Sequence, residues 1–207
     1  MAYRKTEKVL EHLAARRAAI VDAAVHVMAI GGADELRVGD VASRAGIAVG
    51  ALYRYFTTRE DLVAAAVARV LGDDVAAIRE AAAAVSPRKG LAASLGVLVR
   101  RLTARPRVTK VMVAIPAYRL TLREEVEDLI KAVLPTLPSG EARILAAVTV
   151  GAIFEASGTL TAADAKNERT LVSIVLRAIG VSGHFARAQF DQPVEGVASR
   201  AHVADDD

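Results

Sequence analysis

The sequence contains no cysteine among its 207 residues, and only 4% of them are aromatic. Without cysteine the chain has no disulfide, no thiolate nucleophile and no cysteine-ligated zinc. The longest uncharged apolar run, residues 144–154, is well short of the roughly 20 residues that a transmembrane helix needs. The first 17 residues are charged and contain no apolar signal-peptide segment. We therefore expect a cytoplasmic protein with no membrane partner.

Motifs for catalysis are also missing. The four histidines lie far apart in the sequence, and none has the spacing of a metal ligand. The chain has no G-x-S-x-G motif, no phosphate-binding glycine loop and no dinucleotide fingerprint. We interpret the acidic cluster within residues 124–128 as a solvated helix face rather than an acid/base pair. These observations predict no catalytic residue, no metal site, no cofactor and hence no enzyme.

Alanine supplies much of the 53% apolar content, with 43 residues. Alanine has the highest helix propensity, and neither period-two alternation nor hairpin turns are evident, so we expect an all-α fold. Apolar periodicity predicts about nine helices. The fourth follows an N-cap at Thr57 or Thr58 and ends near residue 85, and Pro116 is expected to kink the sixth. The other approximate ranges are 6–29, 38–45, 49–55, 88–104, 107–120, 121–134, 140–163 and 167–181.

Charge and periodicity divide the chain into three parts. We expect an N-terminal helix-turn-helix domain at 1–62, a helical domain at 63–183 and a flexible tail at 184–207. The first 20 residues carry a net charge of +3 and the tail −3, while the whole chain sums to +3. The sum is too small to identify a partner, but the N-terminal positive charge could lie against a DNA backbone or form a solvated face.

The segment from Val38 to Leu62 has the pattern of a helix-turn-helix. Ala42 is small where two helices must cross closely, and Gly46 suits a turn that requires a positive φ. Apolar residues fill a small core beneath, namely Val41, Ala45, Ile47, Leu52 and Phe56. The second helix would then present short residues and polar or aromatic side chains outward, where they could reach phosphates and base edges.

This longer string resembles the DNA-binding domain of the TetR/AcrR family of bacterial transcription regulators. The resemblance covers about residues 16–63. The matched residues are Ile20, Ala23-Ala24, Gly32, Val38, Asp40-Val41-Ala42, Ala45-Gly46-Ile47, Gly50, Leu52-Tyr53, Tyr55-Phe56 and Arg59-Glu60-Asp61-Leu62.

The resemblance implies a homodimer that places one helix-turn-helix per subunit in successive major grooves of operator DNA. Arg59 replaces the family's usual phosphate-binding lysine. Arg37 and Ala48 stand where the family often has capping hydroxyls, and each loss costs typically about 1 kcal/mol. The residues that fall where the family contacts DNA are Val49, Gly50, Ala51, Tyr53, Arg54, Tyr55 and Arg59.

For the second domain, the resemblance implies an effector pocket and a dimer interface. The helices at about 140–163 and 167–181 would pair across the dimer axis, although the same periodicity suits an intramolecular core. Because few aromatics are present, we expect a small apolar effector of aliphatic character. The predicted lining is Leu98, Leu102, Met112, Ile115, Tyr118 and Phe154.

Five cations lie within residues 100–110. They either form a solvated helix junction or contact an anion. Taken together, the sequence predicts a sequence-specific DNA-binding regulator, a small-molecule-responsive repressor. One alternative is a DNA-binding regulator without such an effector, controlled by a protein or acting as an activator. Another is a helical small-molecule carrier with a vestigial helix-turn-helix.

Overall fold

The computed structural model describes residues 2–33, 35–83, 85–160 and 165–181, so the predicted 184–207 tail lies outside the described residues. Within the described ranges the chain forms nine α-helices and no strand, which confirms the all-α fold. The helices are α1 (Ala2–Gly31), α2 (Val38–Arg44), α3 (Val49–Leu52), α4 (Arg59–Ala83), α5 (Pro87–Ala104), α6 (Pro106–Val113), α7 (Pro116–Val133), α8 (Ser139–Ser157) and α9 (Ala165–Ala178).

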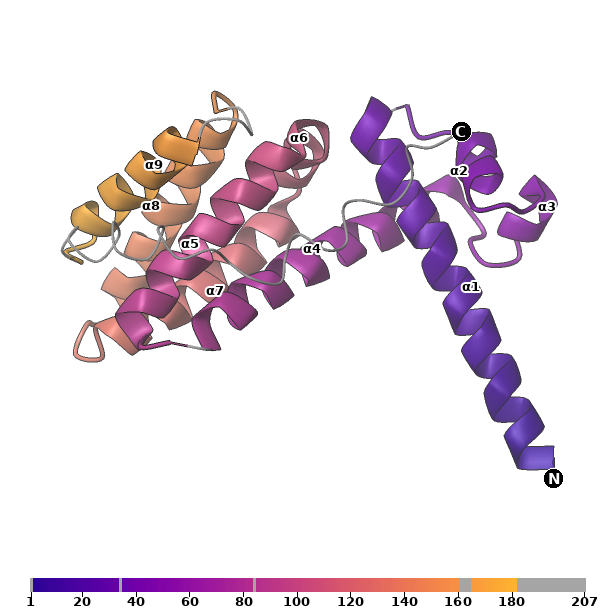
Figure 1. Ribbon diagram of the computed structural model, residues 1–207, viewed down its shortest axis with the longest axis horizontal. Coiled ribbons are helices and arrows are strands. Elements are labelled where there is room, and N and C mark those ends of the chain that lie inside the picture. The colour runs from indigo at the N-terminus through magenta and orange to yellow at the C-terminus, as the bar shows by residue number, and fades with distance from the viewer. Residues whose placement is uncertain (1, 34, 84, 161–164, 182–207) are drawn as a thin grey trace.

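The helices form two groups that α4 connects (Figure 1). Helices α2 and α3 pack at the C-terminal part of α1, and α4 leads from there into a bundle of α5 to α9. The bundle has α5 at its centre, in contact with α4, α6, α7, α8 and α9. Helix α1 contacts both α4 and α6, so the N-terminal group touches the bundle directly.

Helix α1 is longer than the predicted 6–29. It starts at Ala2 and ends at Gly31, where Gly32 adopts a positive φ of 84°. Its C-terminal part is buried through Ile20, Ala24 and Met28. Residues 7–15 are exposed, and this part of α1 projects away from the other helices in Figure 1. The first half of α1 is therefore an extension rather than part of the core.

The turn between α2 and α3 ends α2 with a hydrogen-bond pair typical of the Schellman motif. The amide of Ile47 donates to Ala42 O (3.0 Å), and that of Gly46 donates to Ser43 O (3.1 Å). Gly46 has a φ of +64°, the left-handed conformation that glycine adopts at the least steric cost. The predicted role of Gly46 is thus confirmed. Helix α3 is shorter than the predicted 49–55, since it ends at Leu52 with Tyr53 as its C-cap.

Helix α4 is continuous across the predicted domain boundary at 62/63. Its buried positions are spaced four residues apart and point into the cores of both groups: Leu62, Ala66, Val70, Asp74 and Ile78. Asp74 is fully buried although it is charged. The buried stripe of α4 therefore contains one acid that requires internal partners.

Proline changes the predicted bounds of the middle helices. Pro116 does not kink a helix over 107–120 but begins α7, and the break falls at Ala114 and Ile115. Proline is favoured at the first helical position because it has no N–H to satisfy there, and it keeps the preceding residue extended. Ile115 accordingly has φ −90° and ψ 116°.

The last two helices run Ser139–Ser157 and Ala165–Ala178, shorter than the predicted 140–163 and 167–181. The end of the first predicted range reaches residues 161–163, which the structure does not describe. Among the described residues, no helix is long and apolar enough to cross a membrane. The same residues contain no group of three or more His, Asp or Glu that could hold a metal ion.

Replacing Gly46 by alanine tests the turn. An added Cβ at Gly46 meets no atom within 4 Å, so the cost is that of the left-handed backbone alone. We expect Gly46→Ala to lower the free energy of unfolding by about 1 kcal/mol in urea denaturation. Gly72→Ala, in the exposed middle of α4 and also without a close neighbour, should instead raise it by roughly 0.5–1 kcal/mol. Equal responses of the two variants would contradict this account of the turn.

Candidate nucleic-acid interface

The helix-turn-helix rests on a small apolar core. Val41, Ala42, Leu52 and Phe56 are each at most 2% exposed, and they pack with Ile20 of α1. Ala45 and Ile47, which were predicted in the same core, are half-buried against it. This packing orients α3, which has only four residues.

The residues predicted to contact DNA gather on the surface of α3 and the turn after it. Val49 and Tyr53 are 43% and 48% exposed, and Gly50 and Arg54 are also exposed. Ala51 and Tyr55 are half-buried, so they have less surface available for a partner. Val49 and Tyr53 lie one helical turn apart and are both exposed, whereas Leu52 between them is buried. The short side chains at its start leave its backbone open to close approach.

Arg17 of α1 joins this surface through an aromatic contact. Its guanidinium lies 4.6 Å from the centroid of the Phe56 ring. Arg17 is otherwise exposed, as is Lys8 on the projecting half of α1. The contact with Phe56 holds the positive charge of Arg17 beside the turn that follows α3. A cation–π contact of this kind contributes roughly 0.5–1 kcal/mol at an exposed site.

Arg59, which was expected to contact a DNA phosphate, makes hydrogen bonds within the protein. Its Nε donates to Leu36 O (2.9 Å) and its Nη2 donates to Ala33 O, both in the loop between α1 and α2. Its Nη1 lies 3.8 Å from Oε1 of Glu60. Arg59 thus fastens the start of α4 to that loop. No sequence signal pointed to this role, because the partners are backbone carbonyls. Its contact with DNA stays a prediction.

The helix caps agree with the expectation from the sequence. Arg37 and Ala48 are the N-caps of α2 and α3, and neither makes a side-chain cap hydrogen bond. The start of α4 is capped by a reciprocal pair: Asp61 N–H donates to Thr58 Oγ1 (3.0 Å) and Thr58 N–H to Asp61 Oδ2 (3.1 Å). The recognition helix therefore begins less firmly than the helix that follows it.

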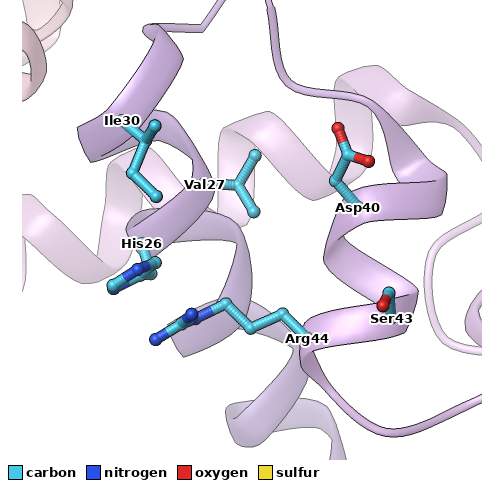
Figure 2. A pocket seen from close by; sticks show the side chains of 6 residues that line it. All are labelled: His26, Val27, Ile30, Asp40, Ser43 and Arg44. Carbon is cyan, nitrogen blue, oxygen red and sulfur yellow. The ribbon is translucent and has the colours of Figure 1, made fainter. Parts of the chain in front are cut away.

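A cleft of about 610 Å³ lies between α1 and α2 (Figure 2). Arg44 extends from α2 toward His26 of α1, with Asp40 and Ser43 on the same wall as Arg44. Partial burial and the positive charge of Arg44 lower the pKa of His26, so this imidazole is neutral at pH 7. The cleft then holds one positive and one negative side chain, and it has no excess charge to attract a nucleic acid.

The predicted effector-lining residues lie in the bundle core. Leu98, Leu102, Met112 and Tyr118 are almost completely buried, Phe154 is 7% exposed and Ile115 is half-buried. The rings of Tyr118 and Phe154 stack with centroids 6.0 Å apart. A second pocket, of about 390 Å³, involves Ile78, Pro87 and Leu129 instead. Neither of the two pockets is lined by the predicted set.

The sequence analysis missed the polar cluster at the bundle's end nearest the N-terminal helices. Asp74 accepts hydrogen bonds from Arg101 Nε (2.6 Å), Arg105 Nη2 (2.7 Å) and the Tyr118 hydroxyl (2.8 Å). Burial, followed by the charge and hydrogen bond of Asp74, raises the pKa of Tyr118 well above its usual range. The sequence did contain a sign of this cluster, because Asp74 lies midway between Val70 and Ile78 on the buried stripe of α4.

Comparison with known proteins identifies the N-terminal fold. Residues 20–66 match the family model described as bacterial regulatory proteins, tetR family. Over 98 residues the chain is 35% identical to the HTH-type transcriptional repressor KstR of Mycobacterium tuberculosis, covering 47% of this chain and 44% of KstR. The KstR of Mycolicibacterium smegmatis is also 35% identical over 98 residues. The aligned part spans less than half the length of these curated relatives.

Solved structures extend the similarity to the whole fold. RolR in complex with its ligand resorcinol superposes with a TM-score of 0.62 at 22% identity, covering 89% of this chain and 97% of RolR. A TetR transcription regulator from Haloarcula marismortui has a TM-score of 0.66 at 16% identity, over 80% and 98% of the two chains. Residues 20–66 thus resemble the tetR family of bacterial regulatory proteins, and the curated relatives that align with this chain are named transcriptional repressors.

The uncapped start of α3 can be tested with Ala48→Ser. Ala48 already has the extended conformation of an N-cap, with φ −69° and ψ 145°. A serine hydroxyl there should accept an amide hydrogen bond of the first turn and raise the free energy of unfolding by about 0.5–1 kcal/mol. Ala51→Ser, inside the same helix, should lower it slightly because serine has a weaker helix propensity. Chemical denaturation measures both, and a neutral or destabilising Ala48→Ser would contradict the cap assignment.

Proposed function

We propose that this chain is a sequence-specific DNA-binding transcriptional regulator, a homodimeric repressor in the cytoplasm that responds to a small molecule. The observation that carries the proposal is the exposed surface of Val49, Gly50, Tyr53 and Arg54 on a helix-turn-helix whose core is closed. A buried or acidic face at these positions would argue against DNA. The curated relatives, which are named transcriptional repressors, support repression rather than activation.

The proposed interface combines base reading with backbone contacts. Tyr53 and Arg54 carry groups that can hydrogen-bond to base edges or phosphates, while Gly50 allows the backbone to approach the groove floor. From Gly46 to Arg59 the segment has two basic residues and no acid. Arg17, placed beside Phe56, adds a further positive charge close to this segment. Arg59 supports this interface from within the protein, because its hydrogen bond to Leu36 O ties the start of α4 to the loop that precedes α2.

The proposed dimer interface lies on the outer surface of α8 and α9. Ile144 and Val148, one turn apart on α8, are 64% and 57% exposed, and Ile174 on α9 is 50% exposed. On the same two helices Phe154 and Val175 are buried within the subunit, as is Ile179 directly after α9, so a second copy cannot contact them. Exposed apolar side chains in one patch mark a protein interface. A second copy would cover them in a four-helix arrangement.

The effector part of the proposal rests on the predicted lining in the bundle core. The predicted lining around Tyr118 and Phe154 is apolar and lies between α4 and α8, where a small ligand would contact the helix that leads to the DNA-binding domain. RolR, a structural neighbour, was solved with the ligand resorcinol. A ligand can shift the DNA-binding equilibrium only by its differential affinity for the two states of the protein.

Alanine substitutions on α3 test the DNA-binding part of the proposal. We expect Tyr53→Ala and Arg54→Ala each to weaken operator binding by roughly 1–3 kcal/mol, because each removes a specifying contact. Arg44→Ala is the matched control, since it removes the same charge from an exposed site in the α1–α2 cleft. An operator selected from random DNA and gel shifts at several salt concentrations provide the measurement. Equal losses for Arg44→Ala and Arg54→Ala would contradict the assigned surface.

Charge placed in the apolar patch tests the dimer. Ile144→Asp or Val148→Asp should raise the dimer dissociation constant about thirtyfold or more, since a charge would be buried in the interface. Leu120→Asp is the control, because Leu120 is 55% exposed on α7, outside the patch. Sedimentation at several protein concentrations distinguishes the variants. An unchanged dimer in both α8 variants would place the interface elsewhere.

A further inference from the structure

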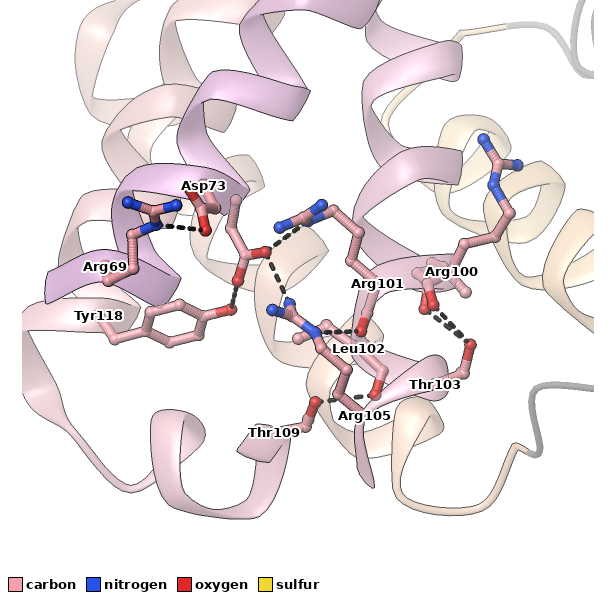
Figure 3. Close-up of polar contacts among 11 residues, drawn as sticks. Arg69, Asp73, Arg100, Arg101, Leu102, Thr103, Arg105, Thr109 and Tyr118 are labelled. Atoms are coloured by element: carbon pink, nitrogen blue, oxygen red, sulfur yellow. Dashed lines mark hydrogen bonds and ion pairs between the residues drawn. The ribbon is translucent and has the colours of Figure 1, made fainter. Parts of the chain in front are cut away.

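The cluster around Asp74 brings together three helices of the bundle (Figure 3). Asp74 comes from α4, Arg101 from α5, Arg105 from the end of α5 and Tyr118 from the first turn of α7. Both arginines donate to the same oxygen, Oδ1, while the tyrosine donates to Oδ2. One carboxylate therefore serves as the common acceptor for three donors.

The cluster has an unbalanced positive charge. Two guanidinium groups face one carboxylate, which leaves a net charge of +1. Among the described residues, no other carboxylate forms an ion pair with Arg101 or Arg105. The neighbouring acid Asp73 is engaged by Arg69 (3.1 Å), and the buried Glu168 lies 3.1 Å from the Thr103 hydroxyl. The site thus retains an attraction for a second anion.

The two arginines combine access to solvent with apolar surroundings. Their side chains are 28% and 25% exposed, whereas Asp74 is fully buried. On the same helix Leu98 and Leu102 are buried, and Met112 of α6 belongs to the same core. A ligand anion could reach the guanidinium groups from outside while its apolar part displaced or extended this aliphatic core. Charge-assisted hydrogen bonds to arginine are among the strongest in proteins.

We propose that Arg101 and Arg105 form a binding site for the carboxylate of an aliphatic acid, and that Asp74 occupies this site when the ligand is absent. The ligand carboxylate and the Asp74 carboxylate compete for the same guanidinium donors. Binding of the acid releases Asp74, and with it α4, from α5. The inference deepens the proposed function, because it assigns a ligand class and a competing internal group to the effector domain.

The position of Asp74 connects this competition to the DNA-binding domain. Asp73, the neighbour of Asp74 on α4, forms an ion pair with Arg69 one turn before it. Arg69 also lies 3.3 Å from Oδ1 of Asp22 on α1. Adjacent residues of α4 are therefore tied to different parts of the molecule, Asp73 through Arg69 toward α1 and Asp74 toward α5 and α7. A shift of α4 at Asp74 changes the placement of α1 and of the helix-turn-helix packed against it.

Octanoate binding to the full-length chain tests the proposal. Calorimetric titration should show that Asp74→Asn binds octanoate about tenfold tighter than the unsubstituted protein, because an amide competes less well than a carboxylate for the two guanidinium groups. Asp73→Asn is the matched control: it removes the same charge from the next residue of α4, which is exposed, and should leave octanoate affinity unchanged. Arg105→Gln should abolish binding, and octylamine should not bind any of the proteins.

Tyr118→Phe provides a second route if Asp74→Asn does not fold. It removes one of the three hydrogen bonds that hold Asp74 and should tighten octanoate binding about threefold. Equal octanoate affinity in Asp74→Asn, Tyr118→Phe and Asp73→Asn would overturn the proposal, as would equal binding of octylamine. Gel shifts on the selected operator separate this inference from the proposed function. If the protein does not bind DNA but the variants show the expected octanoate affinities, the proposed function is refuted and this inference stands.

Discussion

A single buried carboxylate, Asp74, joins the long helix α4 to α5 and α7 through three hydrogen bonds. Isolating this charge in the protein interior would be costly, and two arginines and a tyrosine hydroxyl offset that cost. Removing one partner of a buried ion pair typically costs about 3–5 kcal/mol. The position of α4 relative to α5 and α7 is therefore set by hydrogen-bond geometry as well as by apolar packing. Because α4 also begins at the helix-turn-helix, this constraint extends to both parts of the chain.

The DNA-binding part depends on different interactions. Its core is apolar and local, built from Ile20, Val41, Leu52 and Phe56, and its turn requires Gly46 in a left-handed conformation. Arg59 then joins α4 to the loop between α1 and α2 through backbone carbonyls. The recognition surface can thus keep its internal geometry while α4 changes its position in the bundle. Such a division is what the proposed ligand response requires.

The N-terminal domain was largely predictable from the sequence because its determinants are close together in the chain. The offsets of Ala42, Gly46 and Leu52 predict a close helix crossing and a turn; the structure confirms the turn and buries Ala42 and Leu52 beside it. The Asp74 cluster depends on residues up to 44 positions apart, and a charged residue on an apolar stripe was passed over. Pro116 was wrongly assigned to a kink within one helix, whereas it begins α7, since periodicity alone does not separate a kink from a new start.

The basic segment 100–110 shows why charge counts need geometry. Its cations were open to two interpretations, a solvated junction or an anion site. The structure shows that Arg101 and Arg105 already share an internal anion, whereas Arg107 and Lys110 are exposed. Within one short segment the cations therefore have different environments, and only two of them are placed to connect α5 with α4.

The most direct test is the distance between the two DNA-binding domains of a dimer. Because the chain has no cysteine, Ser43→Cys on the exposed face of α2 would allow one spin label to be attached to each subunit. Double electron–electron resonance then measures the distance between the two labels. The account predicts that octanoate shifts the distance between the two labels, and that Asp74→Asn shifts it in the same direction without octanoate. An identical distance distribution with and without octanoate and with and without Asp74 would contradict the claim that this carboxylate controls α4.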